Sequence, residues 1–204
     1  MPEALLDHLV LATADLEATV AAFAAATGVV PVVGGRHARW GTRNYLVGLG
    51  GTAYLEFLGA DPEPAPDAHP PYPLDRERLV TWAIHPPDAD AFVAEAREQG
   101  VELGELVPLS RRTATGDLLS WRVSSTEPAP YDGLVPFLID WGATLHPTTT
   151  GLPSAELLGL TATHPNAEQV RAVLDRLGLR LDVELGPSRL TAEVRGPSGV
   201  FRCL

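Results

Sequence analysis

The residue best suited to chemistry in this sequence is Glu56, which lies inside the apolar segment YLEFLG. A carboxylate between Leu55 and Phe57 costs free energy unless it meets a cation, a metal ion or water. His8, in LDHLVLA, is the second candidate, because strand alternation puts it on one face with Val10. If the two residues share a cavity wall, they can exchange protons with a bound molecule.

Both residues also have a structural interpretation. His8 can be a strand-end histidine that is bonded to the backbone or to water. Glu56 can form an ion pair with one of the arginines that precede it, Arg36, Arg39 and Arg43. A location of Glu56 beside His8 favours a functional site over these alternatives.

Further polar residues on the predicted strands are candidates for binding a substrate. Thr42 and Asn44 share a face of a strand that otherwise looks buried. Arg43 either anchors a carboxylate or carbonyl of the ligand, or is a surface charge on the other side. Trp121 and Arg122 are adjacent and point to opposite faces, so one can line the cavity while the other belongs to the core or the surface.

The elements that position these residues recur in three units. Each unit begins with a short apolar strand, turns, and continues as an Ala-, Glu- and Arg-rich helix that ends at Gly. The predicted opening strands are 5–13, 79–85 and 157–163, and the helices start after Asp15, after Asp88 and near Pro165. The predicted later strands are 42–49 and 53–58, then 118–123 and 134–141, then 181–185, 189–194 and 200–204.

This repetition predicts the organisation of the chain. A first βαββ module spans 1–60, a Pro-rich linker 61–75, a second module 76–146, and a shorter βαββ-like extension 147–204. The repeated prolines of the linker exclude a regular helix or an interior strand, so it runs over the surface as a stiff connection or a lid.

The order of these segments resembles the vicinal-oxygen-chelate superfamily, and within it the glyoxalase-like proteins. The resemblance is carried by LDHLVLATADLEATVAAF, GGRHARWGTRNYLVGLG, YLEFLG, SWRVS and DGLVPFLIDWG, over roughly residues 4–146. It implies an α+β fold of the glyoxalase/bleomycin-resistance/dihydroxybiphenyl-dioxygenase type. Two βαββ modules lie side by side in this fold, and their curved sheets enclose a small-molecule cavity.

The resemblance also implies a metal site. Metal-using members hold a divalent ion through residues on the first and last strand of each module, and His8 and Glu56 match these positions in the first. Fe, Mn, Ni or Zn suits such ligands. In the second module Thr81 stands where His8 stands in the first, and Asp140 can supply a carboxylate only if the strand register is right. His37 resembles a position that borders the cavity, so Glu56 and His37 are the expected catalytic residues.

Two functions agree with these residues. The first is a metal-assisted lyase, isomerase or dioxygenase that acts on a small oxygenated substrate, and it requires a third protein ligand. The second is a metal-free protein that binds or sequesters a small molecule, or uses Glu56 as a base, and it requires that Thr81 leave a ligand position vacant. The fold alone does not decide between them.

Composition excludes several partners. The 15 Lys and Arg residues against 26 Asp and Glu residues give a net charge of -11, which leaves no basic surface for nucleic acid. No apolar run is long enough to span a membrane, and the start lacks the pattern of a secretion signal. The single cysteine suits a reducing compartment, so a cytoplasmic location is expected. The superfamily resemblance and the apolar face of the third helix predict a homodimer.

Overall fold

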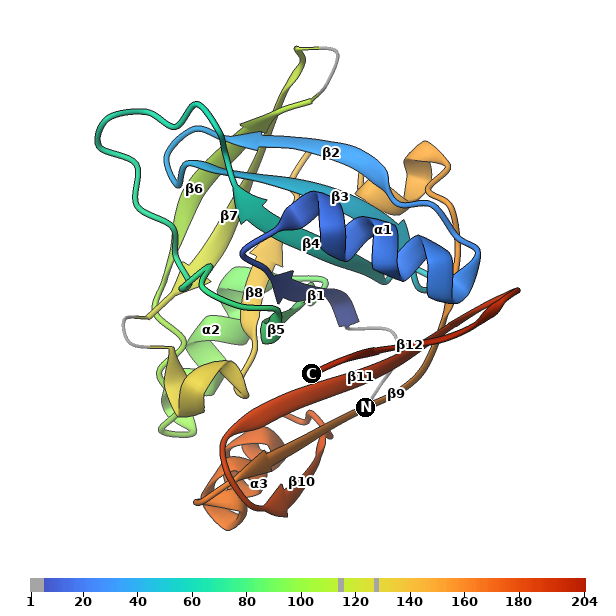
Figure 1. The fold of residues 1–204 in the computed structure, drawn as a ribbon. Helices are drawn as coiled ribbons and strands as arrows, with labels where there is room; N and C mark the ends of the chain where they lie inside the picture. The colour runs from blue at the N-terminus through green and yellow to red at the C-terminus, as the bar shows by residue number, and fades with distance from the viewer. Residues whose placement is uncertain (1–5, 114–115, 127–128) are drawn as a thin grey trace.

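The computed structural model describes residues 6–113, 116–126 and 129–204. It is an α+β protein in which the described strands form one continuous sheet, with α-helices packed outside it (Figure 1). The elements are β1 (Leu6–Ala12), α1 (Leu16–Thr27), β2 (Val32–His37), β3 (Thr42–Gly48), β4 (Tyr54–Ala60), β5 (Arg78–Ile84), α2 (Ala89–Glu98), β6 (Glu105–Arg112), β7 (Leu118–Ser125), the 3-10 turn η2 (Pro130–Gly133), β8 (Phe137–Asp140), the 3-10 turn η3 (Pro147–Thr150), β9 (Glu156–His164), α3 (Ala167–Arg176), β10 (Asp182–Leu185), β11 (Arg189–Gly196) and β12 (Gly199–Cys203).

The helix starts and the repeat between the first two units are confirmed. The side chain of Asp15 accepts the backbone N–H of Ala18 at 3.0 Å, and that of Asp88 accepts the N–H of Ala91 at 2.9 Å. The two caps therefore occupy the same place in their units. Counting back seven residues from each cap aligns His8 on β1 with Thr81 on β5.

The two units close into an eight-stranded barrel. Its strands follow the order β1-β4-β3-β2-β6-β7-β8-β5, and β5 returns to pair with β1. The β1–β5 seam is antiparallel and runs from Leu6 to Ala12, whereas the β2–β6 seam consists of the single pair Arg36 and Arg112. Side chains that alternate inward from all eight strands therefore face one central space.

β2 and β6 were missing from the predicted strands. Gly34 and Gly35 interrupt the side-chain pattern of β2, and Pro108 lies within β6, so neither segment alternates in the usual way. Both are strands nonetheless, since β2 pairs along β3 and β6 pairs along β7. His37 is the last residue of β2.

The C-terminal extension is a third, smaller unit, as the sequence predicts. β11 joins the barrel sheet through the pair Leu190 and Leu79, and β9, β10 and β12 follow from it. Figure 1 shows this unit below α1, with β12 passing close to the helix. Phe23 of α1 lies between the two layers, with its ring centre 5.0 Å from that of Phe57 and 5.3 Å from that of Phe201. The extension therefore covers α1 and completes the core around it.

Trp82 and the Pro-rich linker both contact the barrel. Trp82 is fully buried, and its Nε1 donates to the carbonyl of Leu134 at 2.9 Å, so it packs in the core. The linker reaches the barrel: Pro71, Tyr72 and Pro73 lie at the central cavity. Among the described helices, none has the length and apolar character needed to cross a bilayer.

Candidate functional site

A large cavity with a volume of about 1160 Å³ is lined by residues of the barrel strands and extends to the linker and the start of β11. His8, Asn44, Glu56 and Thr81 line it, together with three tryptophans, Trp40, Trp121 and Trp141. Of the adjacent residues Trp121 and Arg122, it is Trp121 that lines the cavity. Trp40 and Trp141 also contribute aromatic surface to the cavity.

His8 and Glu56 lie side by side on the cavity wall. They lie on neighbouring parallel strands, where Val10 of β1 pairs with Glu56 of β4. The Nε2 atom of His8 is 3.8 Å from Oε2 of Glu56, beyond hydrogen-bond distance, so both atoms remain available to a ligand. The His8 ring stacks on Tyr54, with 4.7 Å between the ring centres. Both residues are buried and touch the same space.

Asn44 connects Glu56 to a buried cation that sequence analysis missed. The amide Nδ2 of Asn44 donates to Oε1 of Glu56 at 2.6 Å, and its Oδ1 accepts from a guanidinium nitrogen of Arg111 at 3.3 Å. Arg111 belongs to β6 and is only 6% exposed. Gly34 makes room for both, since a Cβ there would lie 2.2 Å from Asn44 Oδ1 and 2.6 Å from Arg111.

No carboxylate among the described residues lies within ion-pair distance of Arg111. A buried guanidinium is costly unless an anion or several hydrogen bonds compensate it. Its side chain lines the cavity, so an anion inside the barrel can supply this compensation.

His37 lines the cavity and contacts Thr42, which is fully buried and does not line it, contrary to the predicted place of Thr42 at the ligand. They are directly opposite in the β2–β3 ladder, and the Nδ1 atom of His37 lies 3.1 Å from the hydroxyl of Thr42. Burial lowers the pKa of His37 to about 4; the charge of Glu56 opposes this shift, and that of Arg111 adds to it. The imidazole is therefore neutral near neutral pH, which suits a hydrogen-bonding role.

The second unit does not supply the ligands that the superfamily pattern requires. Thr81 takes the place of His8, and its hydroxyl donates to the carbonyl of Gly133 at 3.2 Å. In the β5–β8 ladder Ala83 pairs with Phe137, as Val10 pairs with Glu56 in the first unit. An apolar ring therefore stands where a second carboxylate is needed. The donor set at the cavity does not fit the superfamily's metal site.

Asp140, the predicted third ligand, does not lie with His8 and Glu56. Its carboxylate accepts from Arg122 at 2.6 Å, and Arg122 also donates to Asp90 of α2 at 2.7 Å. The register of β8 turns Ile139 toward the cavity instead, and neither Asp140 nor Arg122 lines it. Arg43 likewise lies outside the cavity and pairs with Glu17 of α1 at 2.6 Å.

Asp7 does not line the cavity, and its carboxylate contacts polar side chains from three segments of the chain. One of its oxygens lies 2.5 Å from Nδ1 of His8, while the other lies 2.9 Å from Nδ1 of His85 and 3.0 Å from Nε2 of His146. The indole of Trp141 donates to that second oxygen at 2.9 Å. Burial alone would raise the pKa of Asp7, but hydrogen bonds from His146 and His8, together with the nearby imidazole of His85, hold it well below its usual range.

A β-bulge explains why Asp7 points to this cluster. Leu6 pairs with Ile84 and His8 with Ala83, so Asp7 is an extra residue in β1. The sequence contains no direct signal of this bulge. The adjacent Asp-His pair was the signal that could have drawn attention to Asp7.

A barrel of paired βαββ units around such a cavity defines a protein of the vicinal-oxygen-chelate superfamily, as the sequence predicts. The chain belongs to the glyoxalase-like domain family, whose match covers residues 6–178. None of the curated proteins matches this sequence.

Two solved structures share the fold at low sequence identity, and a third gives a weaker match. A hypothetical protein from Staphylococcus aureus is 14% identical with a TM-score of 0.68, over 97% of this chain and 84% of that one. A mutant of 4-hydroxymandelate synthase from Streptomyces coelicolor is 15% identical with a TM-score of 0.53, over 100% of this chain and 63% of that one. A methylmalonyl-CoA epimerase from Streptomyces coelicolor is 22% identical with a TM-score of 0.45, over 69% of this chain and 99% of that one. The first two alignments include the third unit.

Proposed function

We propose that this protein binds a small carboxylate inside the barrel and transfers a proton at the carbon beside a carbonyl group, with Glu56 as the general base. The observation that carries the proposal is the line Arg111–Asn44–Glu56, which joins a buried cation without a carboxylate partner among the described residues to a buried carboxylate. The first can hold an anion, and the second can accept a proton.

Arg111 supports the choice of a carboxylate substrate. A guanidinium binds a carboxylate through two parallel hydrogen bonds, and such charge-assisted bonds are stronger in a buried site. Trp121, Phe137 and Trp141 also line the cavity, so its wall offers apolar surface to the carbon chain of such a ligand.

Glu56 and His8 support proton transfer. Asn44 holds Oε1 of Glu56, while Oε2 faces the cavity and Nε2 of His8. Asp7 accepts the Nδ1 proton of His8, which leaves the Nε2 lone pair free in the neutral imidazole. Glu56 can therefore remove a proton from carbon, and His8 can exchange one with the neighbouring oxygen of the substrate.

This assignment uses the metal-free alternative among the functions that the sequence allowed. Thr81 and Phe137 do not complete the superfamily's metal site beside His8 and Glu56, so no step of the proposed reaction passes through an ion at that position. Removal of the proton by Glu56 leaves a carbanion beside the carbonyl. If the carbanion is reprotonated the reaction is an isomerisation, and if it expels a group the reaction is that of a lyase; the substrate determines which occurs.

Proton transfer can be measured without knowledge of the product. The protein is incubated in D₂O with a series of straight-chain α-keto acids, from α-ketobutyrate to α-ketocaproate, and loss of the proton signal beside the carbonyl is followed by NMR. We expect exchange with the wild type and a rate about 10²- to 10⁴-fold lower with Glu56→Gln, because the general base is lost.

Arg111→Met tests the anion. We expect it to weaken binding of the acids by about tenfold to a hundredfold, since a charge-assisted hydrogen bond is worth about 1.5–3 kcal/mol. Binding of the corresponding methyl esters should not change. Arg112→Met is the matched control, because Arg112 is the exposed neighbour on β6. Binding of the acids without exchange in the wild type would contradict the proton-transfer function and favour the sequestering alternative.

Gly34→Ala is expected to disturb the site while leaving the fold intact. The added Cβ collides with the ends of two flexible side chains, Asn44 and Arg111, and not with the backbone. We expect a melting temperature near that of the wild type and weaker binding of the α-keto acids. Gly159→Ala is the control, because nothing lies within 4 Å of a Cβ at that position. Equal binding in both variants would argue against a role for the Asn44–Arg111 arrangement.

A further inference from the structure

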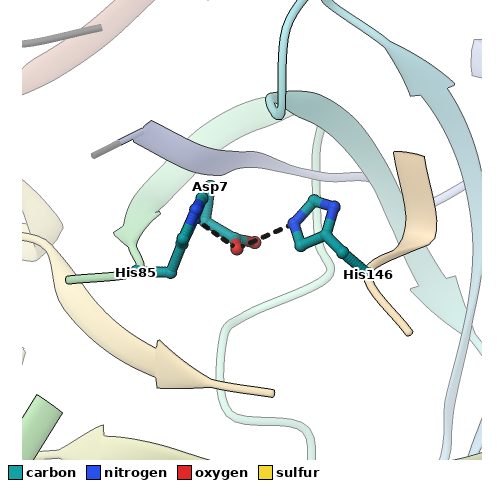
Figure 2. A group of neighbouring side chains, drawn as sticks. All are labelled: Asp7, His85 and His146. Carbon is teal, nitrogen blue, oxygen red and sulfur yellow. Dashed lines mark hydrogen bonds and ion pairs between the residues drawn. The ribbon is translucent and has the colours of Figure 1, made fainter. Parts of the chain in front are cut away.

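We propose that Asp7, His85 and His146 form a binding site for a divalent first-row transition metal, separate from the cavity pair His8 and Glu56. Figure 2 shows the two imidazoles on either side of the carboxylate. One ligand atom from each residue lies within 4.8 Å of the others. The three come from the β1 bulge, the end of β5 and the segment before η3, so the fold brings together groups that are far apart in the chain.

The geometry of His85 is the first argument for an ion. Its Nδ1 is 2.9 Å from Oδ2 of Asp7, close enough for an ion pair, yet this buried nitrogen makes no hydrogen bond of acceptable angle. A buried polar atom without a hydrogen bond costs about 1–3 kcal/mol. The nitrogen lies near the carboxylate oxygen but does not point at it. Both atoms can therefore direct a lone pair at a metal ion that lies between them.

The distances are the second argument. Oδ2 of Asp7 lies 2.9 Å from His85 Nδ1 and 3.0 Å from His146 Nε2. Bonds of about 2.0–2.2 Å to a first-row ion put ligand atoms about 3 Å apart when they meet at right angles. Two imidazoles and one carboxylate are also a donor set that such ions prefer over Mg²⁺ or Ca²⁺.

Access and competing contacts are consistent with this site. The side chains of His85 and His146 are 28% and 15% exposed, whereas that of Asp7 is fully buried, so an ion can enter and keep water ligands. Trp141 also donates to Oδ2 of Asp7, and His8 occupies Oδ1. A carboxylate has about four lone-pair positions, which leaves room for an ion beside these two contacts.

The site differs from the superfamily's metal position. That position lies inside the barrel and uses His8 and Glu56, whereas Asp7, His85 and His146 do not line the cavity. The proposal therefore does not depend on the proposed proton transfer, and separate variants test the two.

The experiment is titration of the untagged, chelator-treated protein with Co²⁺, followed by its visible absorption, and with Zn²⁺ by calorimetry. We expect about one ion per chain in the wild type, and binding at least tenfold weaker in His85→Ala and in His146→Ala. Glu56→Gln and His69→Ala are the controls, since Glu56 lies in the cavity and His69 is exposed in the linker. Both controls should bind as the wild type does.

Three results would overturn the proposal. They are absence of Co²⁺ and Zn²⁺ binding in the wild type, unchanged binding in His85→Ala, and loss of binding in Glu56→Gln, which would move the ion into the cavity. Circular dichroism checks that each variant is folded. His85→Gln and His146→Gln keep the side-chain volume and a polar group, so they replace the alanine variants if those unfold. Weaker binding in the glutamine variants supports the site, and unchanged binding refutes it.

Discussion

Asp7→Asn is expected to lower the free energy of unfolding by about 3–5 kcal/mol in metal-free buffer, because it removes one partner of a buried charged network. Asp7 is fully buried and meets the side chains of His8, His85, His146 and Trp141. Asparagine offers one acceptor oxygen in place of two, so buried donors lose their partners. Urea unfolding followed by circular dichroism measures the change.

Asp182→Asn is the matched control for this prediction. Asp182 is an exposed carboxylate at the start of β10, so its replacement should change the stability by no more than about 0.5 kcal/mol. A loss of less than 1 kcal/mol in Asp7→Asn would show that the network adds little to the stability of the folded chain.

The stability of the protein is expected to fall by about 3 kcal/mol between pH 6.5 and pH 4 through His37 alone. The pKa of His37 is about 4 in the folded chain against 6.5 for the free side chain, and desolvation is the main cause. In this window the unfolded chain binds the proton and the folded chain does not. The contribution is therefore complete above pH 6.5 and is lost as the pH falls to 4.

Unfolding by urea at a series of pH values checks this, with His37→Gln as the test variant. Glutamine keeps a polar group near Thr42 but does not titrate, so the variant should lose stability less steeply than the wild type over the same range. His69→Gln is the control, because His69 is exposed and should leave the slope unchanged. Equal slopes in the wild type and His37→Gln would contradict the prediction.

Local signals in the sequence were enough to predict most of the fold. Asp15 and Asp88 cap their helices as their residue type and position suggest, and Gly28 ends α1 in the left-handed region with φ 75. Alternation within β1 and β4 put His8 and Glu56 on one wall, which the β1–β4 register and the cavity bear out geometrically. These features depend on a few neighbouring residues, so they can be read from the chain.

Features that depend on long-range pairing could not be predicted. β6 carries Pro108 and does not alternate, and Arg111 was overlooked together with its strand. The placement of Asp140 required the register between β7 and β8, in which Arg122 pairs with Asp140. A shift of one residue reverses the face, and no local signal fixes it. The contact between Asp7 and His146 likewise depends on the path of the segment before η3, which is far from Asp7 in the sequence.

The two seams of the barrel differ in the number of residues that they pair. β1 and β5 are joined along their whole length, whereas β2 and β6 meet at one pair, in which two arginines face each other. Arg36 is paired with Asp61 at 2.6 Å, so its charge is already compensated and the difference between the seams lies in the number of paired residues. The shorter seam has fewer ladder hydrogen bonds to break, so we expect backbone amides at the β2–β6 seam to exchange with solvent before those at the β1–β5 seam.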